Sequence, residues 1–204
     1  ASGKSGKIKT LYNKNRYPHS LGLLYSAVTH YLGWKHHCDE GIIMGLAPYG
    51  DSSKIIPRFK KSYLQVFKEI LTNKGDFQYK INLDYIDYYS ARDKWVTDKF
   101  IKIFGPKRKW IDPLTSHHKN IAAALQDQLE NVVLKQLKIA RRKFNLKNLC
   151  LAGGVALNCV ANGNILKDKI FENIWIQPAA GDAGGSLGAA LAYWYLELKK
   201  ERKI

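Results

Sequence analysis

A short apolar segment that runs into a glycine-rich turn and then into a helical pattern occurs twice in the last third of the chain. The first copy predicts a strand over residues 148–152, a turn at Gly153 and Gly154, and a helix over 155–166. The second copy begins with a strand over 174–176. Strands that alternate with helices are typical of an open α/β sheet, and the usual right-handed crossover makes these two strands parallel neighbours. Both turns then lie at one sheet edge, where such sheets bind ligands.

The first turn places two residues without a Cβ between a strand and a helix. Gly153 and Gly154 would let backbone N–H groups approach an anion at the helix N-terminus. Considered alone, however, the pair favours a tight strand-to-helix turn that binds nothing. The segment is not a P-loop, because no Gly-Lys-Ser/Thr follows, and it is not a GxGxxG motif. Taken alone, this turn does not identify a ligand site.

The second turn repeats the arrangement and adds a carboxylate. A loop over 178–185 contains Gly181 and Asp182, and a helix with an apolar seam is predicted over 187–198. Asp182 could cap that helix, or it could hold a cation that faces phosphates. Two such turns on consecutive strands indicate a phosphate-binding edge more strongly than either turn does alone.

The rest of the chain is predicted to be mostly helical. Ser20 is expected to cap a helix that Gly33 ends, and Ser116 to cap the longest helix, which keeps one apolar face as far as Phe144. The other elements expected are helices over 40–47, 63–71 and 93–104, and strands over 7–12 and 77–83. We interpret residues 51–116 as an insertion rich in aromatics, and residues 117–204 as the core α/β part.

Composition narrows the class of protein. The 46% of hydrophobic residues is enough for a packed core. No run of 18 apolar residues and no signal-peptide pattern is present, so we expect a soluble protein without a membrane partner. Three widely spaced cysteines argue against a disulfide framework and favour a cytoplasmic location, with Cys150 as a buried, inert thiol. A start without Met, in polar sequence, suggests a piece of a longer protein.

The formal net charge of +16 is compatible with a nucleic acid, an anionic membrane surface or phosphorylated substrates as partner. The charges fall in short scattered pairs and triplets, such as those at 60–61, 107–109 and 141–143, and not in one stripe. This distribution favours a solvated surface. We therefore do not expect a nucleic acid partner.

Motifs in the same order along most of the chain indicate a family. The C-terminal group comprises Leu149 to Asn158, Gln177 to Gly184, and Gly188-Ala189-Ala190. The upstream groups are Ser20-Leu21-Gly22 to Gly33, Glu40-Gly41 to Gly50, and Ile121-Ala122-Ala123 with Gln126 and Glu130. Together they resemble the carbamoyltransferase family that includes nodulation protein U and the cephamycin and tobramycin O-carbamoyltransferases.

This resemblance implies an α/β fold: a ribonuclease-H-like half of an actin-like ATPase domain (Kae1-like), akin to the universal tRNA threonylcarbamoyl transferase. It also implies that ATP and carbamoyl phosphate form carbamoyl-adenylate, which passes its carbamoyl group to a hydroxyl of a small molecule. A divalent metal, with iron expected, would take part. By motif position the implied contacts are Gly153, Gly154, Asn158 and Gly181 beside the nucleotide, Glu40 near its ribose, and Asp182 at the metal.

Two parts of the family pattern are expected to lie outside this chain. They are the N-terminal half-domain, with its paired metal-binding histidines, and the C-terminal YrdC-like domain that handles carbamoyl phosphate. The pairs His36-His37 and His117-His118 are adjacent, whereas ligation from one helix face needs i, i+4 spacing, so we interpret them as surface or loop residues. No nucleophile or Ser-His-Asp set is evident, and the catalytic residues are left open.

Three functions remain open from the sequence. The leading hypothesis is a fragment of an ATP-dependent O-carbamoyltransferase that is inactive by itself. One alternative is an actin-like binding module without catalysis. Another is a tRNA-modification protein that binds RNA, which the charge of +16 would suit. The acceptor cannot be read, because its recognition would lie in loops and in domains outside the chain.

Overall fold

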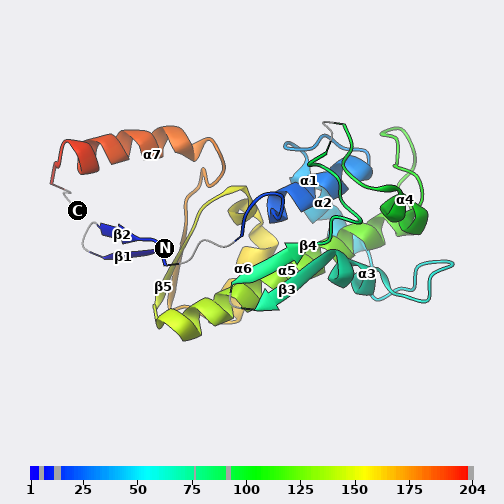
Figure 1. The fold of residues 1–204 in the computed structure, drawn as a ribbon, viewed down its shortest axis with the longest axis horizontal. Helices are drawn as coiled ribbons and strands as arrows, with labels where there is room; N and C mark the ends of the chain where they lie inside the picture. Colours follow the sequence, from blue (N-terminus) through cyan, green and yellow to red (C-terminus); the bar gives the residue numbers. More distant parts are fainter. Residues whose placement is uncertain (5–6, 12–14, 76, 91–92, 202–204) are drawn as a thin grey trace. The chain divides into compact units, whose positions relative to one another are not determined.

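The chain is a mixed α/β protein that divides into two compact units, Ala1–Phe144 and Asn145–Ile204 (Figure 1). A computed structural model describes residues 1–4, 7–11, 15–75, 77–90 and 93–201. Among these residues there are three separate two-stranded sheets.

The first unit is mostly helical. Its helices are α1 (Leu21–Tyr31), α2 (Glu40–Leu46), the 3-10 turn η1 (Ala47–Tyr49), α3 (Tyr63–Ile70), α4 (Asp98–Phe104) and α5 (Ser116–Phe144). Its antiparallel hairpins are β1 (Ser2–Lys4) with β2 (Lys7–Lys9), and β3 (Leu71–Gly75) with β4 (Gln78–Ile81). The strand predicted over 7–12 is confirmed for its first three residues. Residues 12–14 lie outside the described part.

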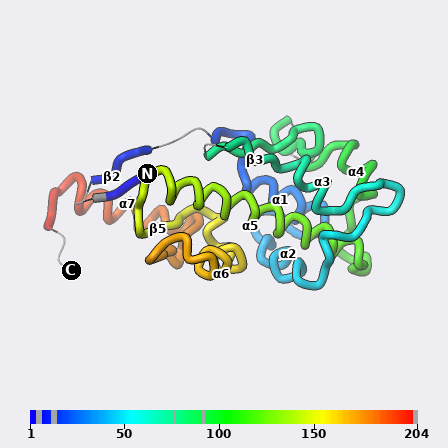
Figure 2. The backbone as a smooth tube through the Cα atoms, turned by 90° about the horizontal axis from the view of Figure 1, so that it is seen from below, coloured from blue at the N-terminus to red at the C-terminus, as the bar shows by residue number. Residues whose placement is uncertain are grey.

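The core of the first unit forms around the first half of α5. Ile121, Leu125 and Leu129 are at most 1% exposed, and this stretch contacts α1, α2, η1, α3 and β3 (Figure 2). Phe67 of α3, on the opposing side of that core, is fully buried. The apolar face predicted for this helix is therefore confirmed as far as Val132, beyond which its side chains are half-buried or exposed.

The predicted signals at the ends of α1 are confirmed. The Ser20 hydroxyl accepts a hydrogen bond from the Leu23 N–H at 3.3 Å. Gly33 ends the helix with φ +93°, and a Cβ at this position would lie 2.8 Å from the Arg108 carbonyl oxygen. The buried Arg108 guanidinium donates to the Leu32 carbonyl at 2.9 Å, so this close approach fixes the segment after α4 against α1.

Two predictions in residues 51–116 need correction. The helix predicted from residue 93 begins at Asp98, because Thr97 caps it and Val96 pairs with Ile86 in an extended bridge. Leu71 was assigned to a helix end but begins β3, a strand that the sequence did not predict. In both places pairing with a distant segment overrides the helical pattern.

The second unit contains the repeated strand–turn–helix arrangement. Its elements are β5 (Asn148–Leu151), the 3-10 turn η2 (Gly154–Leu157), α6 (Cys159–Lys167), β6 (Asn173–Ile176), α7 (Gly184–Ala192) and the π-helical turn η3 (Tyr193–Glu197). β5 and β6 pair in parallel, with Leu149 opposite Ile174 and Leu151 opposite Ile176. The prediction of neighbouring parallel strands is confirmed.

Both helices of this unit differ from the prediction at their ends. The helix expected over 155–166 starts only at Cys159, because a 3-10 turn over Gly154–Leu157 precedes it. The helix expected over 187–198 starts three residues earlier, at Gly184, and continues as a π-helical turn. The low helix propensity of Gly184 and Gly185 explains why the start of α7 was predicted too late. The start of α6 is set by Asn158, whose side chain caps the helix.

The second unit buries few side chains. Its buried residues are Ala156, Ala161, Ile165, Phe171 and Ala180. The seam predicted on α7 is exposed, with Leu187, Leu191 and Trp194 each between 46% and 49% accessible. The expectation of a buried Cys150 is wrong, since this thiol is exposed on a strand that pairs on one side with β6.

Candidate functional site

The two glycine turns of the second unit lie at one edge of the β5–β6 pair. The Gly153 N–H, just after β5, donates to the carbonyl oxygen of Ala180 in the loop after β6, at 2.7 Å. On the same side, a Cβ at Gly181 would lie 3.7 Å from Leu157 Cδ1. The structure therefore brings Gly153, Gly154 and Gly181 together, as the sequence predicted for a shared edge.

The backbone of the first turn has a conformation and an opening that suit a ligand. Gly153 has φ +98°, a region that residues with a Cβ rarely adopt. A Cβ at Gly154 would meet no atom within 4 Å, so the space in front of this turn is open. The 3-10 turn η2 begins here, and the first N–H groups of a helix have no partner within it. Open space and unpaired donors are what an anion site needs.

Asn158 has a structural role in this arrangement. Its side-chain oxygen accepts a hydrogen bond from the Ala161 N–H at 3.0 Å and so caps α6. Asn162 supports the same turn, because its side-chain amide donates to the Ala156 carbonyl at 2.8 Å. Asn158 therefore positions the helix that follows η2, whether or not it also touches a nucleotide.

Asp182 does not cap α7. The N-cap position is Ala183, without a side-chain hydrogen bond, and Asp182 takes part in the turn through its carbonyl oxygen, which accepts from the Gly185 N–H at 2.9 Å. Its exposed carboxylate has no hydrogen bond or ion pair within the described part of the chain. Gly184 beside it is sterically required, since a Cβ there would lie 2.2 Å from the Ala179 carbonyl oxygen. The carboxylate is thus held at the shared edge without a structural partner.

Asp182 alone does not make a metal centre. In the residues that the structure describes, no group of three or more His, Cys, Asp or Glu side chains could hold a metal ion. Protein sites for iron, magnesium or calcium use several oxygen or nitrogen ligands. The described residues therefore do not fit a complete metal site, and further ligands would have to come from elsewhere.

Glu40 lies in the first unit, at the first position of α2. Its Oε1 accepts hydrogen bonds from the His37 N–H at 2.7 Å and from the Ser26 hydroxyl. No partner of its other carboxylate oxygen, Oε2, is found among the described residues. Two donors on one oxygen fix the orientation of the carboxylate and leave the second oxygen as an acceptor.

Sequence reasoning did not single out Ser26. This buried side chain lies on α1, fourteen residues before Glu40 in the chain, and it contacts the carboxylate only because α1 packs against α2. A polar network continues from the neighbouring Tyr25, whose hydroxyl donates to Gln126 at 2.9 Å, and Gln126 donates to Glu130 at 2.6 Å. Burial, with the Glu130 carboxylate second, raises the pKa of the Tyr25 hydroxyl, which therefore stays protonated.

The adjacent histidine pairs are only partly surface or loop residues. His37 is exposed in the loop between α1 and α2, as expected, whereas His36 stacks on the buried Trp95 with ring centroids 4.3 Å apart. His117 is half-buried in the first turn of α5, where Tyr63 and the Phe104 carbonyl lie 2.6 and 2.7 Å from its two ring nitrogens. His117 therefore joins α3, α4 and α5, and the interpretation as a surface or loop residue is wrong for it.

Within the described part of the chain, no helix is both long enough and apolar enough to cross a membrane.

The comparisons with known proteins agree with the motifs at these turns. The family model "Carbamoyltransferase N-terminus" matches residues 3–191. The uncharacterized protein sll1178 from Synechocystis sp. is 46% identical over all of this chain and 32% of its own length. Nodulation protein NolO from Bradyrhizobium diazoefficiens is 41% identical over 84% of the chain and 28% of its own length. Nodulation protein U from Rhizobium tropici is 24% identical over 83% of the chain and 30% of its length.

The chain spans about a third of the length of these curated relatives. The match to the family model covers both units, from the β1–β2 hairpin to α7, and includes both glycine turns and Glu40. The chain belongs to the carbamoyltransferase family, of which it matches the N-terminal family model.

Proposed function

We propose that the full-length protein is an ATP-dependent O-carbamoyltransferase, and that this chain supplies part of its nucleotide-binding domain. In this proposal ATP, carbamoyl phosphate and water give carbamoyl-adenylate with release of pyrophosphate and phosphate. The carbamoyl group then passes to a hydroxyl of a small molecule, and AMP leaves. The chain is proposed to be part of an actin-like ATPase fold. Family membership supports the transferase activity, and the glycine turns support the nucleotide.

The observation that carries the proposal is the hydrogen bond between the two turns. The Gly153 N–H bonds to Ala180 O at 2.7 Å, so the open turn at Gly154 and the Asp182 loop are held at the carboxyl ends of two parallel strands. This is the edge at which open α/β sheets bind their ligands. At the first turn, a Cβ added at Gly153 or Gly154 would meet no described atom within 4 Å.

Each group has a role that its chemistry allows. The N–H groups at the start of η2 would bind phosphate oxygens, and Asp182 would be one ligand of a metal whose other ligands lie outside this chain. Glu40 would accept hydrogen bonds from ribose hydroxyls through Oε2, since Oε1 is occupied by His37 and Ser26. Such preorganised donors and acceptors stabilise charge that develops on a leaving phosphate.

An assay that needs no acceptor tests this function. The full-length protein is incubated with ATP and carbamoyl phosphate, and the release of pyrophosphate is followed. Formation of the adenylate predicts release that requires carbamoyl phosphate, and we expect none from the isolated chain. Release that is independent of carbamoyl phosphate, or no nucleotide binding by calorimetry, would contradict the proposal. Turnover by the isolated chain would show that the catalytic groups lie within it.

A further inference from the structure

Two adjoining cavities run along α5 in the first unit. One, of about 410 Å³, is lined by Gly75, Lys135, Lys138, Ile139 and Arg142. The other, of about 330 Å³, includes Lys68, Asn73, Gln128 and Lys135 in its lining. Lys135 lines both cavities, and we call the two together the basic groove.

The basic groove gathers positive charge that is scattered in the sequence. Lys135, Lys138 and Arg142 are three and four residues apart and therefore share one face of α5. Lys68 adds a fourth cation from α3. Like charges at these spacings destabilise a helix, so such a face is not explained by the stability of α5. In the described part of the chain no carboxylate lines either cavity.

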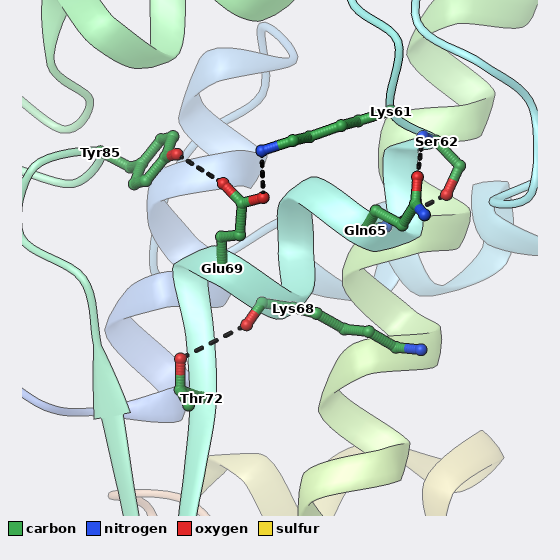
Figure 3. Close-up of polar contacts among 7 residues, drawn as sticks. All are labelled: Lys61, Ser62, Gln65, Lys68, Glu69, Thr72 and Tyr85. Carbon is green, nitrogen blue, oxygen red and sulfur yellow. Dashed lines mark hydrogen bonds and ion pairs between the residues drawn. The ribbon is translucent and has the colours of Figure 1, made fainter.

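The carboxylate next to Lys68 is occupied elsewhere. Glu69 receives the Lys61 ammonium at 2.6 Å and the Tyr85 hydroxyl at 3.0 Å. Figure 3 shows the Lys68 side chain extending away from Glu69, while the Lys68 carbonyl oxygen accepts a hydrogen bond from the Thr72 hydroxyl at 3.3 Å. Glu69 therefore does not neutralise the charge that Lys68 brings to the groove.

Amide groups at the same place have unused hydrogen-bonding capacity. Asn73 Nδ2 and Gln128 Oε1 are buried and have no hydrogen-bond partner among the residues that the structure describes. Gln128 is oriented by its other atom, since its Nε2 donates to the Leu71 carbonyl at 2.6 Å. Buried polar groups are nearly always paired, so one orphan donor and one orphan acceptor beside four cations point to an occupant that carries negative charge, donors and acceptors.

We propose that the basic groove binds a single-stranded nucleic acid through its phosphates. From Lys135 to Arg142 the cations extend over about 10 Å of helix, which is longer than one phosphate group. An acidic peptide would need apolar side chains of the groove on which to anchor. Leu71 and Val132 are at most 1% exposed, so Ile139 is the accessible apolar side chain of the lining. Phosphate-dominated binding needs no such anchor. Sugar hydroxyls and bases can supply partners for the orphan amides.

This inference is independent of the proposed carbamoyl transfer, since the groove is built by α3, β3 and α5 and uses none of the residues assigned to the nucleotide. It also changes the expectation drawn from the scattered charges. Cations at 68, 135, 138 and 142 are separated in the sequence, and the packing of α3 and α5 places them along one groove.

The proposal is tested by measuring how the full-length protein binds 15-nucleotide oligouridylate and oligothymidylate, each labelled with fluorescein. Fluorescence anisotropy reports the binding at about 25 to 200 mM KCl. For phosphate contacts by Lys68, Lys135 and Arg142, log K should fall with log[KCl] with a slope of about −2. Lys135→Gln with Arg142→Gln should weaken binding at least tenfold at low salt and make the slope shallower by about 1.4. The RNA and DNA arms report whether the 2′-hydroxyl contributes.

The control removes the same charge elsewhere on the first unit, by Lys60→Gln with Lys102→Gln, two exposed lysines outside the groove. This control should change the affinity for the oligonucleotides less than about twofold. If the α5 variant folds poorly, Lys68→Gln tests the groove through a residue of α3 instead. Equal loss from the control and the groove variant would overturn the proposal. The absence of saturable binding at about 50 mM KCl would also overturn it. The same holds if polyglutamate displaces the labelled oligonucleotides at a lower concentration than unlabelled oligonucleotide does.

Discussion

The two units of the chain bury their apolar residues to very different degrees. The first unit encloses large side chains such as Tyr31, Phe67 and Phe100 at 1% exposure or less. The second buries mainly alanines with Ile165 and Phe171, and α7 has no buried residue. Parallel sheets in proteins are normally covered on both faces, yet both strands of the β5–β6 pair alternate between exposed and half-buried residues.

This contrast separates what the chain stabilises by itself from what it contributes to a larger protein. The first unit has the core that a domain of its length needs. The second has the edge with the candidate site but little apolar burial of its own. The relatives are about three times as long as this chain, and we expect their additional residues to cover β5, β6 and α7.

The largest effect on stability is expected in the core of the first unit. Phe67→Ala removes a fully buried ring that lies 5.8 Å from Phe104 between ring centroids, and it should lower the free energy of unfolding by about 3–5 kcal/mol. Leu191→Ala on α7 is the matched variant in the second unit. In this chain it should cost about 0.5 kcal/mol or less. Urea denaturation measures both, and equal costs would remove the contrast between the units.

The largest effect on activity is expected at Asp182. In the full-length protein, Asp182→Asn should reduce carbamoyl transfer at least about 100-fold, or about 2.7 kcal/mol in activation free energy, because it removes the proposed metal ligand. The fold should be largely unaffected, because the carboxylate has no structural partner within the described part of the chain. Glu197→Gln, an exposed carboxylate of the same unit, is the control. Transfer rate, metal content and melting temperature are measured together. A lower melting temperature with unchanged metal and turnover would assign Asp182 a structural role.

The two glycines of the first turn should respond differently to the same change. Gly153→Ala forces a Cβ into φ +98° and ψ 158°, a region used essentially by glycine, and should destabilise the second unit by about 1–3 kcal/mol. Gly154→Ala adds a methyl group to open space, so stability should change little while nucleotide affinity falls about tenfold, or 1.4 kcal/mol. Denaturation and calorimetry with ATP distinguish these outcomes. Unchanged affinity for ATP in Gly154→Ala would argue against phosphates at this turn.

A smaller effect concerns pH and the first unit. Burial, reinforced by Lys107 and His36 and opposed by Asp93, lowers the pKa of His30 to about 4. In the unfolded chain the pKa of His30 is about 6.5, so between about pH 4 and about 6.5 the unfolded chain binds more protons than the folded chain. The free energy of unfolding is therefore highest above about pH 6.5 and falls as the pH drops towards 4. Solvent screening limits the loss to about 1 kcal/mol. His30→Gln should remove this part of the pH dependence in denaturation curves, and an unchanged pH profile would contradict it.

The sequence by itself determined the elements whose signals are local. Ser20 and Gly33 specify the two ends of α1 through its backbone groups. The repeating apolar positions of α5 specify that helix through side-chain periodicity. Both helices were predicted. The parallel pairing of β5 with β6 followed from the strand–turn–helix order and from the handedness of crossovers. The positions of the glycines likewise predicted that both turns share an edge.

Only the tertiary structure decided features that depend on partners distant in the chain. Pairing of Val96 with Ile86 replaced predicted helix with extended backbone, and packing of α1 against α2 brought Ser26 to Glu40. Lys68 joined the α5 cations of the basic groove because α3 packs on α5. Periodicity reports which face of an element is apolar, but it does not report which element covers that face, and this is why the exposure of Cys150 and of α7 was not predicted.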